Sequence, residues 1–186
     1  MRLSGKKILL TGANGGIGRA IAEKALAEGA HLVLCDKTSE LAESAKAALP
    51  NNTNSIALAA DITDENAVQA MIAQAISELG GLDGVVNNAA MLADDDGMLA
   101  DTPLKSWQNT LAVNLTGAFL VYKHALPHLV EQQSGSLVTM SSVVAHSASA
   151  VPQIAYTASK GGLEAMTREI AIAHARENIR ANCVAP

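Results

Sequence analysis

The stretch KKILLTGANGGIGRAIAEKALAEGAHLVLCD, Lys6–Asp36, holds two short apolar runs separated by a longer segment with a helical pattern. The run Lys6–Gly12 predicts a strand, and Gly16–Glu28 predicts a helix that Gly29 closes. The run Ala30–Asp36 predicts a second strand. Because a helix carries the chain back across the sheet between them, the two strands are expected to pair in parallel as a βαβ unit.

The same alternation continues along the rest of the chain. The further expected elements are a helix over 39–49, a strand over 55–61, a helix from Thr63 or Asp64 to about 79, a strand over 82–89, a long helix over 103–132, a strand over 135–142, a helix over 154–177 and a strand over 179–186. Ser39 is the expected cap of the second helix. Strict alternation predicts an α/β fold with a doubly wound parallel sheet and helices on both faces. No linker interrupts it, so residues 1–186 are expected to form a single domain.

Composition agrees with this fold and excludes some functions. The chain has 186 residues, of which 49% are hydrophobic and only 2% aromatic, so its core must be built from Ala, Val, Ile and Leu. A buried parallel sheet covered by helices has such a core. The net charge is −5 and no basic cluster is present, which argues against binding to nucleic acid.

The cellular location is expected to be the cytoplasm. Cys35 and Cys183 have no metal-like spacing and indicate reduced, buried thiols. The N-terminus runs straight into a strand without a signal peptide, and no apolar run has the length of a membrane span. We therefore expect no membrane partner.

The turn TGANGGIG, Thr11–Gly18, connects the first strand to the first helix. Its glycines permit a tight turn and a close approach of the backbone to a ligand. The helix that follows presents unpaired N–H groups and a positive dipole end to a pyrophosphate. Because the strand and the helix give the glycines the right context, nucleotide binding is favoured over a purely structural turn. The residues expected to bind here are Gly12, Asn14, Gly15, Gly16, Ile17 and Gly18.

Asp36 ends the second strand. A carboxylate at this place can accept both ribose hydroxyls of an adenosine and would repel a 2′-phosphate, which predicts NAD rather than NADP. The alternative is a solvated aspartate at a strand end. Lys37 is a contrary signal, since its ammonium could attract a phosphate.

The stretch AYTASKGG, Ala155–Gly162, places Tyr156 four residues before Lys160, on the same face of the expected helix. Tyrosine titrates near pH 10, so its use as a base at neutral pH requires roughly 4 kcal/mol of preferential phenolate stabilisation. The Lys160 ammonium and the dipole of the first helical turn both favour the phenolate. The alternative is a tyrosine and a lysine that merely share a solvated helix face.

Together these motifs make the chain resemble the short-chain dehydrogenase/reductase family over all 186 residues. The matching elements are Thr11–Gly18, Asp36, Asp61–Thr63, Asn87–Ala90, Asn114, Ser136–Ser142 and Tyr156–Lys160. The resemblance implies a Rossmann-type sheet that binds NAD(H) or NADP(H). It also implies hydride transfer between the nicotinamide and an alcohol or carbonyl, with Tyr156 as the general acid and base.

The resemblance further assigns cofactor contacts. Asp61 would hydrogen-bond the adenine and Ile62 would pack beside it, while Asn88 and Ala90 would line the cofactor cleft. The family usually has glycine where this chain has Ala90, so a methyl group must fit there. Members that prefer NADP often carry a basic residue at the position of Gly15, which again favours NAD.

The catalytic set implied by the resemblance is Asn114, Ser142, Tyr156 and Lys160. Ser142 would hold the substrate oxygen, with Ser141 as its rival, since successive strand residues point to opposite faces. Asn114 would hold a water that relays protons from Lys160, although it could also be a helix residue bonding its own backbone. Lys160 would bind the nicotinamide ribose as well as tune Tyr156.

The remaining polar residues are expected to have no catalytic or metal-binding role. Asp94–Asp96 is interpreted as a solvated acidic turn, and no metal site is expected. His146 and Gln153 are interpreted as loop residues, with substrate contact as the alternative. In the family, helices matching 103–132 and 154–177 pair across a twofold axis, so a homodimer or homotetramer is expected, with burial inside the monomer as the competing explanation.

After CVAP the family continues with a glycine, a substrate-binding loop and a seventh strand, so the fold is expected to be truncated after its sixth strand unless the natural chain continues. The expected substrate is a small secondary alcohol such as a polyol or sugar. One alternative is a 3-oxoacyl-(acyl carrier protein) reductase, although Gln133 and Glu177 stand where such enzymes often have arginine, with Arg176 adjacent. The other is a dinucleotide-binding protein without turnover.

Overall fold

The computed structural model describes residues 1–50 and 54–186. These residues form one parallel sheet with the strand order β3-β2-β1-β4-β5-β6. The strands are β1 (Lys7–Thr11), β2 (His31–Asp36), β3 (Ser55–Ala59), β4 (Gly84–Asn87), β5 (Gly135–Met140) and β6 (Ile179–Val184). The order reverses between β1 and β4, and in such sheets ligands bind outside the carboxyl ends of the strands at this point. The predicted doubly wound parallel α/β fold is confirmed.

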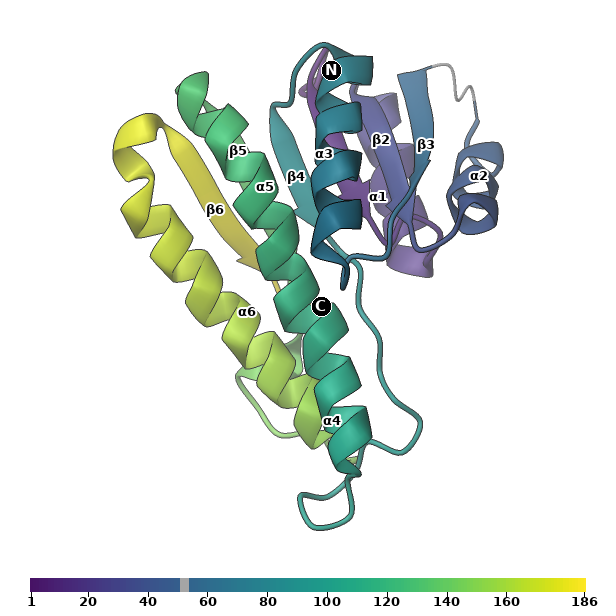
Figure 1. Cartoon of the computed structure of the whole chain (residues 1–186), viewed down its shortest axis with the longest axis vertical. Helices are drawn as coiled ribbons and strands as arrows, with labels where there is room; N and C mark the ends of the chain where they lie inside the picture. Colours follow the sequence, from purple (N-terminus) through teal and green to yellow (C-terminus); the bar gives the residue numbers. More distant parts are fainter. Residues whose placement is uncertain (51–53) are drawn as a thin grey trace.

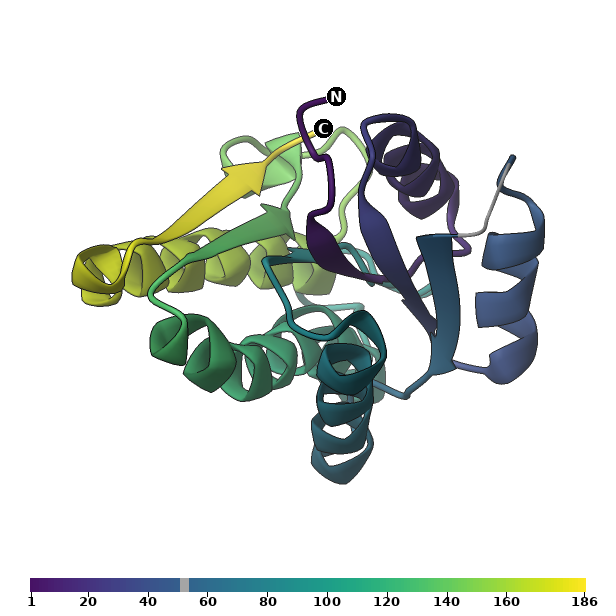
Figure 2. The same cartoon turned by 90° about the horizontal axis from the view of Figure 1, so that it is seen from above.

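Helices cover both faces of the sheet. They are α1 (Gly16–Ala27), α2 (Ser39–Ala47), α3 (Glu65–Leu79), α4 (Leu104–Leu111), α5 (Ala118–Glu131) and α6 (Ile154–Ala173). Figure 2 shows α3, α5 and α6 on one face and α1 on the other. Successive strand residues point to opposite faces of the sheet, so each face has its own hydrophobic core. Leu9 of β1 belongs to the core with Val68 and Val121, whereas Leu10 belongs to the core with Ala22 of α1.

Three element boundaries differ from the sequence expectation. The long helix over 103–132 contains a π-helical turn, η2 (Ala112–Gly117), between α4 and α5. The cap of α2 is Thr38, whose hydroxyl accepts the Leu41 N–H, and not Ser39. Helix α6 ends at Ala173 rather than near 177, because a 3₁₀ turn leads to Asn178 in the left-handed conformation with φ 56°.

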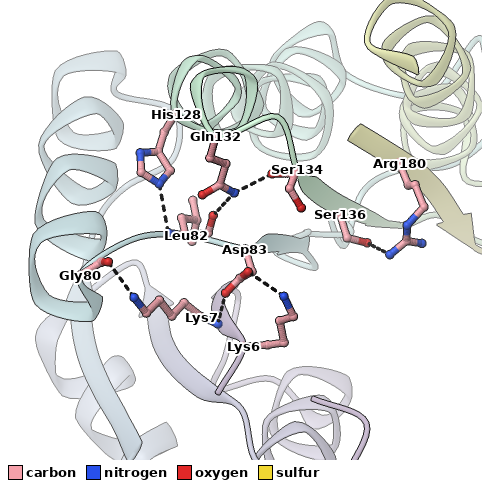
Figure 3. Close-up of polar contacts among 10 residues, drawn as sticks. All are labelled: Lys6, Lys7, Gly80, Leu82, Asp83, His128, Gln132, Ser134, Ser136 and Arg180. Atoms are coloured by element: carbon pink, nitrogen blue, oxygen red, sulfur yellow. Dashed lines mark hydrogen bonds and ion pairs between the residues drawn. The ribbon is translucent and has the colours of Figure 1, made fainter. Parts of the chain in front are cut away.

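Polar contacts tie the elements together at the amino edge of the sheet (Figure 3). The Asp83 carboxylate accepts hydrogen bonds from the Lys7 N–H and from Lys6 Nζ, both at 2.9 Å. The Gln132 amide donates to the Leu82 carbonyl at 2.7 Å, which holds the end of α5 against the start of β4. This cluster faces away from the carboxyl edge, and its exposed Lys6–Asp83 ion pair contributes little stability.

A hollow of about 760 Å³ lies on the α1 side of the sheet. Apolar side chains of the strands line it, among them Ile8, Val86 and Val138. Of the residues expected to bind cofactor or substrate, its lining contains Ile17. The predicted catalytic residues lie elsewhere, at the carboxyl edge.

Candidate active site

The turn after β1 depends on two of its glycines. Gly12 has φ +63°, and a Cβ added there would meet the Ala89 Cα at 2.7 Å. A Cβ added at Gly18 would collide with the Gly12 carbonyl oxygen. The backbone therefore folds tightly here, and side chains at these positions would prevent it.

The start of α1 fits a pyrophosphate. Its N-cap is Gly15, which supplies no side-chain hydrogen bond, and its first turn contains no acidic residue. A Cβ added at Gly16 would meet no described atom within 4 Å. The first N–H groups of a helix have no partner within it and carry its positive dipole end, so the start of α1, with space beside Gly16 and no acidic group, has what an anion requires.

Asp36 sits half-exposed beside this turn, at the end of β2. Its carboxylate accepts the Asn14 N–H at 2.9 Å and the Lys37 N–H at 2.8 Å. The Lys37 ammonium lies 3.0 Å from the Asp61 carboxylate, so it is directed at Asp61. Hydrogen bonds from Thr63 and this ion pair lower the pKa of Asp61.

Asn88, Ala90 and Ile62, the remaining residues expected to contact the cofactor, differ in burial and in hydrogen bonding. Asn88 braces the turn, since its amide donates to the carbonyls of Thr11 and Gly12 at 3.2 and 2.9 Å. Ala90 is exposed and lacks a positive φ, so its methyl group fits without strain. Ile62 is buried and packs against η2 at Gly117.

Tyr156, Ser142 and Lys160 come together at the carboxyl edge of β5. Tyr156 is the third residue of α6 and is half-buried. The Ser142 side chain lies near enough to the Tyr156 hydroxyl to lower the pKa of that tyrosine. Lys160 is only 2% exposed, and its ammonium lies 5.3 Å from the centre of the Tyr156 ring.

The electrostatics of this group differ from the sequence expectation. Burial raises the pKa of Tyr156, and the hydrogen bond from Ser142 opposes this shift. Burial lowers the pKa of Lys160 to about 8, and its amine donates to the Met140 carbonyl at 2.7 Å. The chain alone therefore does not produce the expected lowering of the tyrosine pKa.

The two serines that follow β5 have different partners. The Ser141 hydroxyl is buried and donates to the Glu164 carboxylate at 2.8 Å. His146 lies 3.0 Å from the same carboxylate. The structure thus places Ser142, and not Ser141, beside Tyr156.

Asn114 lies in the π-helical turn and is buried. Its oxygen accepts the Met91 N–H at 2.8 Å, and its amide donates to the Met91 carbonyl at 2.9 Å and the Ser159 hydroxyl at 3.0 Å. The side chain therefore does not bond its own helix. It joins the loop after β4 to α6, a role that sequence reasoning missed.

Sequence reasoning also missed Asp96. It is not a solvated member of an acidic turn, because its carboxylate accepts the Ala155 and Tyr156 N–H groups. One signal was available: the segment VPQIAY offers no Ser, Thr, Asp or Asn to cap the helix that begins there. An uncapped helix start needs partners from elsewhere in the chain.

In residues 1–50 and 54–186, no group of three or more His, Cys, Asp or Glu side chains could hold a metal ion. Over the same residues, no helix combines the length and the apolar character needed to cross a membrane.

Comparison with known proteins identifies the family. The model of the short chain dehydrogenase family matches residues 6–186, nearly the whole chain. The chain belongs to the short-chain dehydrogenase family. The resemblance inferred from the glycine turn and from Tyr156–Lys160 is thereby confirmed.

Relatives and solved structures of this family match the full chain. L-fucose dehydrogenase of Mus musculus is 33% identical over 100% of this chain and 66% of the relative. 2-(S)-hydroxypropyl-CoM dehydrogenase 3 of Xanthobacter autotrophicus is 36% identical over 100% of this chain and 72% of the relative. An NAD⁺-bound xylitol dehydrogenase structure superposes with a TM-score of 0.95 at 30% identity, covering 100% of this chain and 71% of that one. The chain thus spans about two thirds of the length of the curated relatives it matches.

Proposed function

We propose that this short-chain dehydrogenase transfers hydride between a nicotinamide dinucleotide and a secondary alcohol or its carbonyl product, with Tyr156 as the general acid and base. The observation that carries the proposal is the convergence of Ser142, Tyr156 and Lys160 at the carboxyl edge of β5. Family membership and the NAD⁺-bound structural neighbour support the nicotinamide cofactor.

In the oxidation direction, the Tyr156 phenolate takes the proton of the substrate hydroxyl. The Ser142 hydroxyl donates to the same oxygen and holds it beside Tyr156 as the carbonyl forms. When bound, the nicotinamide supplies the acceptor for the hydride that leaves the carbinol carbon. In the reverse direction the neutral Tyr156 returns the proton to the oxygen. Transfers of this kind contribute about 10²- to 10⁴-fold to rate.

In our proposal Lys160 would stabilise the phenolate once the cofactor is bound and would bind the ribose hydroxyls of the nicotinamide half. Its amine now donates to the Met140 carbonyl, so binding a ribose would require it to share or exchange this bond. In our proposal Asn114 acts in the same site, as the residue that holds the proton-relay water.

We propose NAD as the preferred cofactor. The glycine turn Gly12–Gly18 would hold the pyrophosphate, and the Asp36 carboxylate would hold the adenosine ribose. A 2′-phosphate at Asp36 would meet a negative charge, and Lys37 is directed at Asp61. Asp61 and Ile62 would contact the adenine, and Asn88 and Ala90 would line the cofactor cleft.

The proposed substrate is a small secondary alcohol such as a sugar or polyol. Support comes from the names of the relatives, which include L-fucose dehydrogenase and glucose 1-dehydrogenase 2 of Bacillus subtilis, and from the xylitol dehydrogenase structure. We further propose that residues 1–186 act as one dinucleotide-binding domain in the cytoplasm. Exposed apolar side chains such as Phe119 on α5 and Ile172 on α6 support an oligomer formed through the helices.

The test is turnover of NAD⁺ with a panel of sugars and polyols, followed by a single substitution. We expect Tyr156→Phe to lower kcat by at least about 10²-fold, because it removes the proton acceptor. We expect the same variant to retain NADH binding, measured by fluorescence. Activity that survives Tyr156→Phe would refute the mechanism, and NADH binding without turnover of any alcohol would favour a non-catalytic dinucleotide-binding protein.

A further inference from the structure

The loop between β4 and α4 reaches the first turn of α6. Figure 1 shows this loop at the lower ends of α4 and α6. Residues 91–102 of the loop include Asp96, whose side chain is half-buried, and Asp94 and Asp95, whose side chains are exposed. Asp96 is 60 residues from Tyr156 in the sequence, yet it is bonded to it.

The loop supplies partners for the first three N–H groups of α6. The two oxygens of the Asp96 carboxylate accept the Ala155 N–H at 3.0 Å and the Tyr156 N–H at 2.9 Å. The Gly97 carbonyl accepts the Ile154 N–H at 3.3 Å. The helix's own cap residue, Gln153, makes no side-chain cap bond. Asp96 thus performs the capping that the local sequence of α6 lacks.

The loop is anchored outside itself at Met91 and is also bonded within itself. Met91 is bonded through both its N–H and its carbonyl to the Asn114 side chain. Gly97 donates its N–H to the Thr102 hydroxyl at 2.9 Å, and this hydroxyl donates to the Met98 carbonyl at 2.9 Å. These bonds order the loop on both sides of Asp96.

The other side of the Tyr156 peptide is held as well. The Ser159 hydroxyl donates to the Tyr156 carbonyl at 2.7 Å and accepts the Asn114 amide at 3.0 Å. The backbone of Tyr156 is thus hydrogen-bonded at its N–H by Asp96 and at its carbonyl by Ser159. Both contacts lead back to the same loop, through Asp96 directly and through Asn114 and Met91.

We propose that Asp96 is a positioning residue, which fixes the first turn of α6 so that the Tyr156 hydroxyl faces Ser142. It touches neither substrate nor cofactor and acts through the Tyr156 backbone. This inference rests on the proposed function, in which Tyr156 transfers the proton. Displacements of about 1 Å in such a group cost up to about 10²-fold in rate.

The kinetic test compares Asp96→Ala and Asp96→Asn with Asp95→Ala in the whole chain. Asp95→Ala removes the same charge from the same loop but no bond to α6. We expect Asp96→Ala to lower kcat about 10- to 100-fold with unchanged NADH affinity. Asp96→Asn keeps one acceptor oxygen and should recover part of the rate, whereas Asp95→Ala should match the parent. Equal kcat values in all four proteins would overturn the proposal, as would a loss explained by weaker NADH binding.

A second measurement needs neither substrate nor turnover. The only tyrosines of the chain are Tyr122 and Tyr156, so ¹³C labelling at the ring Cζ gives two resonances. Tyr122 is a buried residue of α5 and serves as the internal reference. We expect Asp96→Asn to shift or broaden the Tyr156 resonance alone. An unchanged Tyr156 resonance would overturn the positioning role even if no alcohol were oxidised, and absent turnover in the parent would count against the proposed function only.

Discussion

At the scale of single residues, the site depends on a lysine whose buried charge destabilises the folded chain. Lys160 lies at a core position with 2% exposure, next to Tyr156, and its pKa is lowered to about 8 by burial. Its ammonium keeps one protein acceptor, the Met140 carbonyl. Strained or charged groups held against the preference of the fold are typical of functional sites.

This burial predicts a specific dependence of stability on pH. Below about pH 8, Lys160 is protonated in both states and its buried charge destabilises the folded chain. Between about pH 8 and 10.5 the unfolded chain binds more protons, so the contribution of Lys160 to the unfolding free energy rises with pH. We expect Lys160→Met to be more stable than the parent at pH 7 by up to about 3 kcal/mol, with the gap closing toward pH 10.5.

The measurement is urea unfolding of both proteins from pH 7 to 10.5. Taking the difference between the proteins removes other groups, such as Cys35, whose pKa burial raises to about 12. Loss of the bond to Met140 adds an offset that does not vary with pH. A difference that stays constant across the range would contradict the argument.

At the scale of elements, the sequence was most informative where a signal is local. The sequence predicted a helix start at Thr63 or Asp64, and the structure has Asp64 as the cap, whose carboxylate accepts the nearby N–H groups of Asn66 and Ala67. The π-helical turn around Asn114 was not predicted, since it is stabilised by contacts with Met91 and Ser159 from other elements. The capping of α6 by Asp96 was missed for the same reason.

Substitutions in the glycine turn can distinguish an effect on the stability of the fold from an effect on NADH binding. A Cβ added at Gly16 points into open space, so Gly16→Ala should leave the unfolding free energy within about 0.5 kcal/mol of the parent or raise it. The same methyl group would occupy the surface proposed for the pyrophosphate. We therefore expect Gly16→Ala to weaken NADH binding at least about 10-fold, a loss of about 1.4 kcal/mol.

Gly18→Ala is the matched control. Its Cβ would collide with the Gly12 carbonyl, so this variant should lose about 1–3 kcal/mol of stability by urea unfolding. If Gly16→Ala binds NADH as well as the parent, the pyrophosphate does not lie at the start of α1.

At the scale of the whole molecule, the fold could be predicted because one pattern repeats along the chain. Apolar runs alternate with helical segments, and each βαβ crossover has one favoured hand, so the parallel sheet follows. The site is different, because it is assembled from segments distant in sequence. Ser142, Tyr156 and Lys160 were identified through their resemblance to a family, whereas Asp96 and Ser159 carry no motif and their roles emerge only from contacts in three dimensions.

Ligand-linked stability tests the cofactor on the entire chain. A ligand that binds only the folded state stabilises it by about 2.7 kcal/mol at 100 times its dissociation constant. For a chain of this length that corresponds to a rise in Tm of about 5 to 10 °C. We expect NADH to produce such a rise, and NADPH at the same concentration to produce a smaller one. The reason is that the half-exposed Asp36 carboxylate would repel a 2′-phosphate.

The substitution Asp36→Asn assigns the effect to this carboxylate. It removes the charge but retains an oxygen that can accept one of the N–H groups now bonded by Asp36, those of Asn14 and Lys37. With the charge gone, Lys37 is the nearest charged neighbour in sequence, so the difference in Tm between NADH and NADPH should shrink or reverse. Thermal unfolding of both proteins, each with and without the two cofactors, gives the comparison. If NADPH stabilises the parent as much as NADH does, Asp36 does not select the cofactor, and the preference for NAD is wrong.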